Sequence, residues 1–189
     1  MIRLLDRHWL LTTTTYGTWL PGDQRGFVSP VRADDGTLEL HNIPGTPYDA
    51  DMPDLQQQAR EFLKCDPIRL TRAQAEAILA QLLDTARYRG WTIVAASVMH
   101  NHLHILVTVP GDPAPSTLLQ TFKSWASRAL NDRWGKPPCE TWWTRKGSKR
   151  KVTGEGGVCA GCRYVYNQPN WLARYADPGV PAHWLTPLP

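Results

Sequence analysis

The centre of the fold can be predicted from residues 99–106, which are Met99-His100-Asn101-His102-Leu103-His104-Ile105-Leu106. It begins a strand predicted over 102–109, and a second apolar strand is predicted just before it, over 91–98. Because side chains alternate between faces along a strand, Leu103 and Ile105 point into a core while His102 and His104 share the other face. The sequence therefore predicts a β-hairpin with one apolar face and one face that carries imidazoles.

Helical and extended segments surround this hairpin in a fixed order. A β-branched run at 8–15 predicts a first strand, and a Gly- and Pro-rich excursion follows it over 17–66. Apolar residues recur at helical spacing in three further segments and in a short one within the excursion. The predicted helices span 54–63, 71–89, 116–134 and 157–168, and a short strand is expected over 142–145, before a basic loop at 146–151.

This order is close to β-α-β-β-α-β, the ferredoxin-like plan. We therefore expect an α+β fold, with an antiparallel sheet, helices packed on one face and a long insertion after the first strand. The length of 189 residues fits a single domain, expected over 1–175, and a Pro-rich C-terminal tail over 176–189.

Composition and charge narrow the class of protein. Apolar residues make up 42% of the chain, and no apolar run approaches the 18 residues of a transmembrane helix, so we expect no membrane partner. The first ten residues lack the features of a secretory signal, which favours a cytoplasmic location. Residues 111–189 carry a net charge of +6 against −2 for residues 1–110, and such a one-sided basic surface suits a polyanion.

Four cysteines are present, at positions 65, 139, 159 and 162. A chain of this size needs no disulfide framework, so reduced thiols are expected. Cys159 and Cys162 form one C-x-x-C pair, whereas a structural zinc site usually draws on two such pairs. We therefore favour small buried helix residues over zinc ligands.

His102 and His104 are candidate metal ligands. Two imidazoles on one face of a strand can bind one metal ion, and the apolar core gains nothing from them. A further ligand should exist, and Tyr164-Val165-Tyr166-Asn167-Gln168-Pro169 offers one. Residues four apart share a helix face, so the Gln168 carboxamide and the Tyr164 phenol project together. The combination suits a nucleophile beside a Lewis acid.

Taken together, these motifs resemble the HUH single-tyrosine transposases, above all the REP-associated tyrosine transposases. The family pattern Met-x-Asn-His-hydrophobic-His matches residues 99–104, and the Tyr-hydrophobic-x-Asn-Asn/Gln-Pro pattern matches 164–169. Between them lie a Lys-Ser helix, with Lys123-Ser124, and a Trp-containing strand at 140–143. His100 stands where many relatives have Pro, which adds a third imidazole.

The resemblance implies metal-dependent cleavage and strand transfer of single-stranded DNA, and so DNA transposition. Tyr164 would be the nucleophile and would form a 5′-phosphotyrosine intermediate. His102, His104 and Gln168 would hold Mg²⁺ or Mn²⁺. The expected partners are DNA hairpins formed by palindromic repeats or element ends. Relatives from insertion sequences act as dimers, so a homodimer is one assembly that the resemblance implies, with a monomer as the other.

The same resemblance gives the basic residues a DNA-binding role. Exposed tryptophans would stack on unpaired bases. The residues expected to contact DNA are Lys123, Arg128, Arg145, Lys146, Lys149, Arg150, Lys151, Trp142 and Trp143, with core packing as the alternative for each tryptophan.

Two other functions remain open at this level. A histidine-triad nucleotide hydrolase has a His-x-His-x-His motif with hydrophobic x, but Asn101 breaks that pattern and 85 residues follow His104. A non-catalytic module could bind single-stranded nucleic acid on a ferredoxin-like sheet. It would leave the set of His102, His104 and Gln168 without a purpose.

Overall fold

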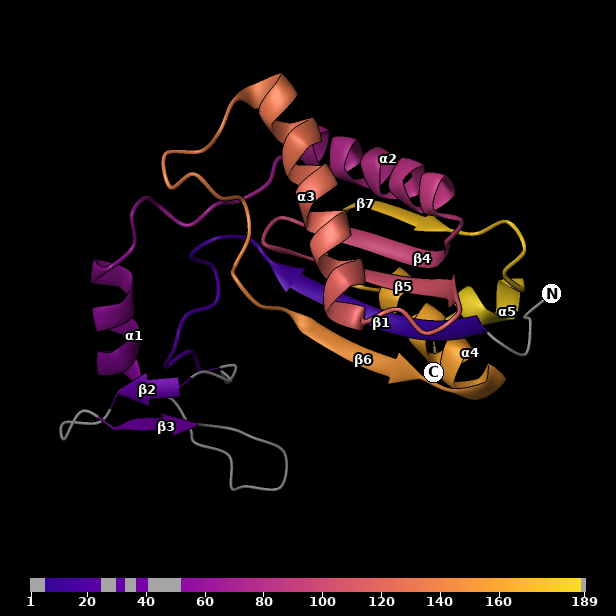
Figure 1. The fold of residues 1–189 in the computed structure, drawn as a ribbon, viewed down its shortest axis with the longest axis horizontal. Helices are drawn as coiled ribbons and strands as arrows, with labels where there is room; N and C mark the ends of the chain where they lie inside the picture. Colours follow the sequence, from indigo (N-terminus) through magenta and orange to yellow (C-terminus); the bar gives the residue numbers. More distant parts are fainter. Residues whose placement is uncertain (1–5, 25–29, 33–36, 41–51, 188–189) are drawn as a thin grey trace.

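Five antiparallel strands form the central sheet of the computed structural model, which describes residues 6–24, 30–32, 37–40 and 52–187 (Figure 1). The strands are β1 (Asp6–Thr14), β4 (Thr92–Met99), β5 (His102–Pro110), β6 (Ser148–Val152) and β7 (Trp171–Ala176), in the order β6-β1-β5-β4-β7. A separate ribbon of β2 (Pro30–Arg32) and β3 (Leu38–Leu40) lies beyond one end of the sheet with α1 (Pro53–Glu61).

The hairpin of β4 and β5 forms the centre of the sheet, as predicted. Leu103, Ile105, Val107 and Val109 are buried in one core cluster, whereas Leu106 belongs to a second cluster on the opposite face. The register of β4 shifts between Ile93 and Ala95, where a β-bulge is formed.

Two helices cover the first face of the sheet, which confirms the expected α+β architecture. These are α2 (Arg72–Arg89) and α3 (Pro115–Trp134), which lie in front of the strands in Figure 1. The Thr71 side chain accepts a hydrogen bond from Gln74 N, and the Gln74 side chain accepts one from Thr71 N, so a capping box begins α2. Gly90 ends this helix with a φ of 68°, a conformation that favours glycine.

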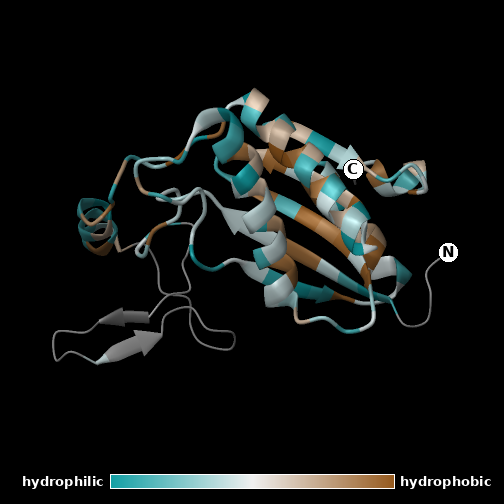
Figure 2. Cartoon of the chain, turned by 45° about the horizontal axis from the view of Figure 1, so that its top comes forward, coloured by the Kyte–Doolittle hydropathy of each residue, from teal (hydrophilic) through white to brown (hydrophobic). Residues whose placement is uncertain are grey.

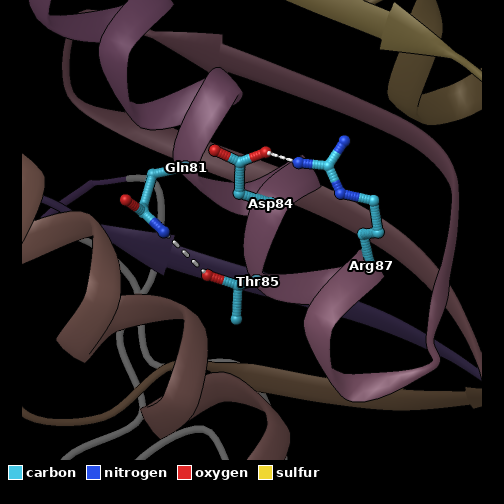
Figure 3. A network of polar contacts seen from close by, with 4 residues as sticks. All are labelled: Gln81, Asp84, Thr85 and Arg87. Atoms are coloured by element: carbon cyan, nitrogen blue, oxygen red, sulfur yellow. Dashed lines mark hydrogen bonds and ion pairs between the residues drawn. The ribbon is translucent and has the colours of Figure 1, made fainter.

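The buried side chains that join these helices to the sheet include Ile78, Leu82, Leu118, Phe122 and Leu130. Figure 2 shows the result as brown strands beneath helices whose outer surfaces are mostly teal and white. Along α2, Gln81 Nε2 donates to the buried Thr85 Oγ1 at 3.2 Å, and on the exposed side of the helix Arg87 pairs with Asp84 at 2.6 Å (Figure 3). Such an exposed ion pair adds little stability.

Two more helices pack on the opposite face. They are α4 (Gly154–Tyr166) and α5 (Ala182–Leu185), which lie behind the sheet in Figure 1. Val158, Cys162 and Val165 of α4 and Trp184 of α5 form the second core cluster with Leu106. The residues after 175, expected as a tail, thus complete β7 and contribute a buried tryptophan.

The region between α3 and α4 differs from the prediction. The strand expected over 142–145 is only an isolated bridge between Trp143 and Thr15, and the basic segment expected as a loop forms strand β6. Trp142 and Trp143 fill the core. The aromatic residues that suggested a strand therefore reflect burial and not extended pairing. Strand β7 was not predicted at all.

The cysteines also differ from expectation. Cys65 and Cys139 form a disulfide, with a Cα–Cα distance of 5.3 Å, so the expectation of reduced thiols is wrong for this pair. Cys159 and Cys162 are free thiols, and Cys162 is buried in α4, as favoured above. None of the helices in the described ranges combines the length and apolar character needed to cross a membrane.

Candidate active site

His102 and His104 lie on the face of the sheet that α4 covers. Their ring centroids are 5.0 Å apart, with the rings nearly perpendicular. His104 is directly opposite Thr12 on β1 and Ser97 on β4, and His102 is opposite Thr14. The alternation that sends Leu103 and Ile105 into the first core cluster therefore brings both imidazoles to the other side, as the sequence predicts.

The Nδ1 atom of each histidine has a partner. His104 Nδ1 lies 2.7 Å from Thr12 Oγ1, and His102 Nδ1 lies 2.6 Å from Asn101 Oδ1. Because an amide oxygen only accepts, His102 Nδ1 is the donor in this contact. Contacts of this kind orient metal-binding histidines in many proteins.

The protonation state of His104 suits a ligand. Burial lowers the pKa of His104 to about 4, and repulsion from His102 adds to the effect. Only 5% of His104 is exposed. The imidazole is therefore neutral at pH 7, and neutral imidazole is the form that binds a cation.

Tyr164, in the last turns of α4, contacts His104. Its ring centroid is 5.1 Å from that of His104, and half of the side chain is exposed. The β4–β5 hairpin and α4 of the same chain thus bring an imidazole and a phenol into contact. Tyr166 points elsewhere, because its ring stacks on Arg174 on β7.

The donor set fits a divalent cation in part. Within the described ranges, no three His, Cys, Asp or Glu side chains gather in a way that could hold a metal ion. A third protein ligand would have to be of another type, and a carboxamide oxygen qualifies. Gln168 follows α4, where its Nε2 donates to the Tyr164 carbonyl oxygen at 2.9 Å, so its Oε1 remains the atom able to bind metal.

A hollow of about 620 Å³ between β6 and α4 reaches Tyr164. Its floor includes Leu10 and the small residues Ala160 and Gly161, and Arg150 and Lys151 line its side. A second hollow, of about 870 Å³, is lined by His100 and Asn101 together with residues of the excursion. One hollow therefore reaches Tyr164 and the other reaches the hairpin turn at His100 and Asn101, and each is large enough for a nucleotide.

The predicted DNA-binding residues fall into two groups. Arg128, Arg145, Lys146, Lys149, Arg150 and Lys151 are exposed. Of these, Arg150 lies opposite Leu10, whose side chain packs against the second core cluster, so Arg150 is on the α4 side of β6. Lys149 lies opposite Leu11, on the other face. Arg128 stacks on the Trp125 ring at 4.8 Å.

Three of the predicted contacts are buried, and for these a DNA-facing role is wrong in this conformation. Trp142 and Trp143 are 6% and 4% exposed, and their indole N–H groups donate to Asn131 Oδ1 and Ser127 Oγ. Lys123 is 8% exposed and donates to the Thr144 carbonyl oxygen at 2.6 Å. It fastens α3 to the segment before β6, which is a structural role.

Sequence reasoning missed Thr12 and Asn101, the partners of the histidines. The sequence did offer a signal for the Asn101 contact, because an amide side chain directly precedes His102. Thr12 was not, because it lies 92 residues from His104 and only the strand register brings the two together.

Two solved structures are similar to this chain along most of its length. The solved structure of a REP-associated tyrosine transposase bound to a REP hairpin is similar over 88% of this chain and 68% of that chain, with 13% identity and a TM-score of 0.48. A protein of Deinococcus radiodurans R1, provisionally assigned as a transposase, is similar over 89% of this chain and 93% of that one, with 15% identity and a TM-score of 0.43. A search of curated proteins found no match.

A model of one protein family matches the central part of this chain. The model of the family described as "Transposase IS200 like" matches residues 68–168, from the start of α2 through both histidines to Tyr164 and Gln168. That stretch is more than half of the chain and contains all four residues of the candidate site. The chain therefore belongs to the IS200-like transposase family.

Proposed function

We propose that this transposase cleaves and rejoins single-stranded DNA through a covalent bond to Tyr164. The observation that carries the proposal is the contact between the Tyr164 and His104 rings, at 5.1 Å between centroids. A half-exposed phenol beside a neutral imidazole, with a second imidazole next to it, is the arrangement expected for a nucleophile next to a cation site. In this structure the phenol and the imidazole that it contacts come from one chain, which supports a site formed within one copy.

In the proposed step, the phenol oxygen of Tyr164 forms a bond to the scissile phosphorus. The bond from phosphorus to the 3′-oxygen breaks, and the DNA 5′-phosphate remains on the tyrosine. The phenol gives up its proton, and the departing 3′-oxygen gains one. Because the phosphodiester is exchanged and not hydrolysed, attack by a 3′-hydroxyl on the phosphotyrosine reverses the step and joins strands without ATP.

His102, His104 and the Gln168 carboxamide oxygen would hold Mg²⁺ or Mn²⁺. When bound, the ion supplies positive charge that stabilises the phosphate oxygens as charge develops on them. Thr12 and Asn101 would hold the two imidazoles in place through the bonds at Nδ1. The low pKa of His104 keeps this ligand unprotonated at neutral pH.

The expected substrate is a DNA hairpin with single-stranded flanks, as family membership suggests. The exposed cations along β6, with the hollow beside Tyr164, favour a path for the DNA backbone between β6 and α4. Salt should therefore weaken binding strongly.

The test is a covalent adduct. Wild-type protein is incubated with an end-labelled hairpin oligonucleotide and Mn²⁺, and the products are separated under denaturing conditions. We expect a protein–DNA band that Tyr164→Phe abolishes and Tyr166→Phe retains, since only Tyr164 contacts His104. An adduct lost in Tyr166→Phe alone would contradict the assignment. Hydrolysis of nucleoside phosphoramidates lost in His102→Ala, without any adduct, would favour a nucleotide hydrolase instead. Tight DNA binding without cleavage in any metal would indicate a passive binding module.

A further inference from the structure

Two arginines and two aromatic rings form a cluster at the free edge of β7. The Arg174 guanidinium lies 4.2 Å from the centroid of the Tyr166 ring and 4.3 Å from that of Trp171. Arg72, at the start of α2, lies 5.9 Å from the same Trp171 ring and donates to the Leu172 carbonyl oxygen. These side chains come from α2, α4 and β7 and have no part in the proposed metal site.

The strand register places this cluster beside the candidate active site. His104 on β5 is directly opposite Ser97 on β4, and Ser97 is directly opposite Arg174 on β7. Neighbouring strands are about 4.8 Å apart, so Arg174 is about 10 Å from His104 across the sheet. Trp171 pairs with Met99, next to the hairpin turn that carries His100 and Asn101.

The positive charge of the cluster has no acidic partner among the described residues. Nowhere in the described part of the chain does a carboxylate form an ion pair with Arg72 or Arg174. Arg174 uses one N–H group for the Tyr166 carbonyl oxygen at 3.3 Å, and the fork geometry of a guanidinium leaves other donors for an anion. Trp171 lies on an edge strand, where 36% of its surface is exposed.

We infer that this cluster, Tyr166–Arg174–Trp171–Arg72, binds single-stranded DNA next to the scissile phosphate. The Trp171 ring stacks on an unpaired base, and Arg174 and Arg72 contact the adjoining phosphates. Aromatic stacking combined with cationic contacts is the usual means of holding a single strand. The inference rests on the proposed function, because it names where the substrate of that same site continues.

The competing interpretation is a purely structural one, in which the cluster only fastens β7 to α2 and α4. The two differ in what Trp171 must supply. A structural role needs an apolar side chain of suitable size, which Leu provides in part and Phe provides as well. Stacking on a base needs an aromatic face, which Phe provides and Leu does not.

The experiment measures binding of a fluorescent hairpin oligonucleotide in a Tyr164→Phe background, so that no cleavage intervenes. We expect Trp171→Leu to weaken binding at least about five-fold, as loss of one stacked base implies, and Trp171→Phe to restore most of it. Tyr88→Leu is the matched control. Tyr88 is 82% exposed and has its own arginine contact, to Arg89, but it lies at the opposite end of α2. This control should bind as the background does.

Two further readouts locate the binding position on the DNA. In an abasic scan of the flanking strand, removal of one base should weaken binding to protein with Trp171, and the same removal should have no effect on Trp171→Leu. Arg174→Gln and Arg72→Gln should each reduce the slope of log Kd against log salt by about 0.7 for every phosphate that the variant no longer neutralises. Thermal melting of every variant shows that it is folded.

The outcomes separate this inference from the proposed function. If Trp171→Leu is folded and binds as tightly as the background while wild-type protein forms the Tyr164 adduct, the inference is overturned and the proposed function stands. If Phe fails to rescue a folded protein, the stacking role is overturned. If wild-type protein neither binds single-stranded DNA nor forms an adduct, both fall together.

Discussion

At the scale of single residues, His104 has the environment that is most unusual for its type. It is a histidine with 5% exposure and a pKa lowered to about 4 by burial and by His102. An unfolded histidine has a pKa near 6.5. Between pH 6.5 and about 4, the unfolded chain therefore binds a proton at this histidine that the folded chain does not bind. This asymmetry gives the metal-free protein a specific dependence on pH.

The free energy of unfolding should be unaffected by His104 above pH 6.5 and should fall as the pH drops from 6.5 to about 4. The full loss is about 3 kcal/mol, the free energy that corresponds to lowering a pKa from 6.5 to about 4. Urea unfolding at a series of pH values, in EDTA, measures it. His104→Gln should flatten the curve over this interval, and an unchanged slope in that variant would show that another group is responsible.

Thr12 gives a second prediction at this scale. Thr12→Val removes the hydroxyl that His104 Nδ1 meets at 2.7 Å, and loss of such an orienting interaction usually costs 10- to 100-fold in metal affinity or activity, about the range we expect here. Mn²⁺ affinity by calorimetry and the rate of adduct formation test it. Thr108→Val is a matched control, since Thr108 bonds His8 Nδ1 at 2.8 Å across the same two strands. Equal effects in both variants would contradict a specific role for Thr12.

What the sequence could predict about residues follows from the range of the interactions involved. The shared face of His102 and His104 depends only on alternation along one strand, and it was predictable. The Thr12 contact depends on pairing between strands far apart in the chain. The burial of Lys123, Trp142 and Trp143 depends on how α3 meets the next segment, so their basic and aromatic character alone wrongly indicated a DNA surface.

At the scale of elements, Gly147, which directly precedes β6, packs closely against β1 near the site. A Cβ atom on Gly147 would lie 2.5 Å from the Thr12 carbonyl oxygen and 2.7 Å from Leu119 Cδ2. The backbone of β1 cannot move away easily, because Thr12 is paired with His104 on its other side. This glycine is therefore required for close approach of two segments of the chain.

We expect Gly147→Ala to lower the free energy of unfolding by about 1–3 kcal/mol, the usual cost of overpacking, and to slow adduct formation by displacing Thr12. Gly156→Ala is the control. Nothing lies within 4 Å of a Cβ there, and alanine favours the helix α4 by up to about 1 kcal/mol. Urea unfolding of both variants decides, and a stabilised Gly147→Ala would refute the packing argument.

Elements with strong local signals were predictable and the others were not. The capping residues of α2 and the apolar stripes of α2 and α3 are local, and these helices were found nearly to the residue. Strand β6 has the sequence Ser-Lys-Arg-Lys-Val, with four of its five side chains exposed, so it shows no apolar alternation. Its extended form comes from hydrogen bonding to β1, which a single sequence does not reveal.

At the scale of the whole molecule, the last helix, α5, packs against α4, the helix that carries the proposed nucleophile Tyr164. Trp184 of α5 is 9% exposed and packs in the same cluster as Val158, Cys162 and Val165 of α4. Asn167, after α4, also donates to the Leu185 carbonyl oxygen at 2.9 Å. The placement of Tyr164 over the histidines therefore depends on residues that follow all of the motifs found in the sequence.

Trp184→Ala should reduce the free energy of unfolding by about 3–5 kcal/mol, the range for a buried tryptophan, and should reduce adduct formation at temperatures where the protein is still folded. Trp134→Ala, at an exposed position, should change stability far less. Chemical denaturation gives the first quantity and the adduct assay the second. Equal stability of the two variants would show that α5 is dispensable.

The bulge in β4 has a consequence for how this protein tolerates insertions and deletions. Val94 is the supernumerary residue between Ile93 and Ala95, and it lies in the second core cluster together with Ala95, so two successive residues share one face of the sheet. An in-frame deletion of Val94 would remove the bulge and leave every later pair as it is, because Ile93 and Ala95 already face opposite core clusters and would then alternate regularly. This strand can therefore lose the residue at position 94 and keep both of its faces, whereas loss of a regularly paired residue such as Ala96 would exchange the faces of the residues beyond it.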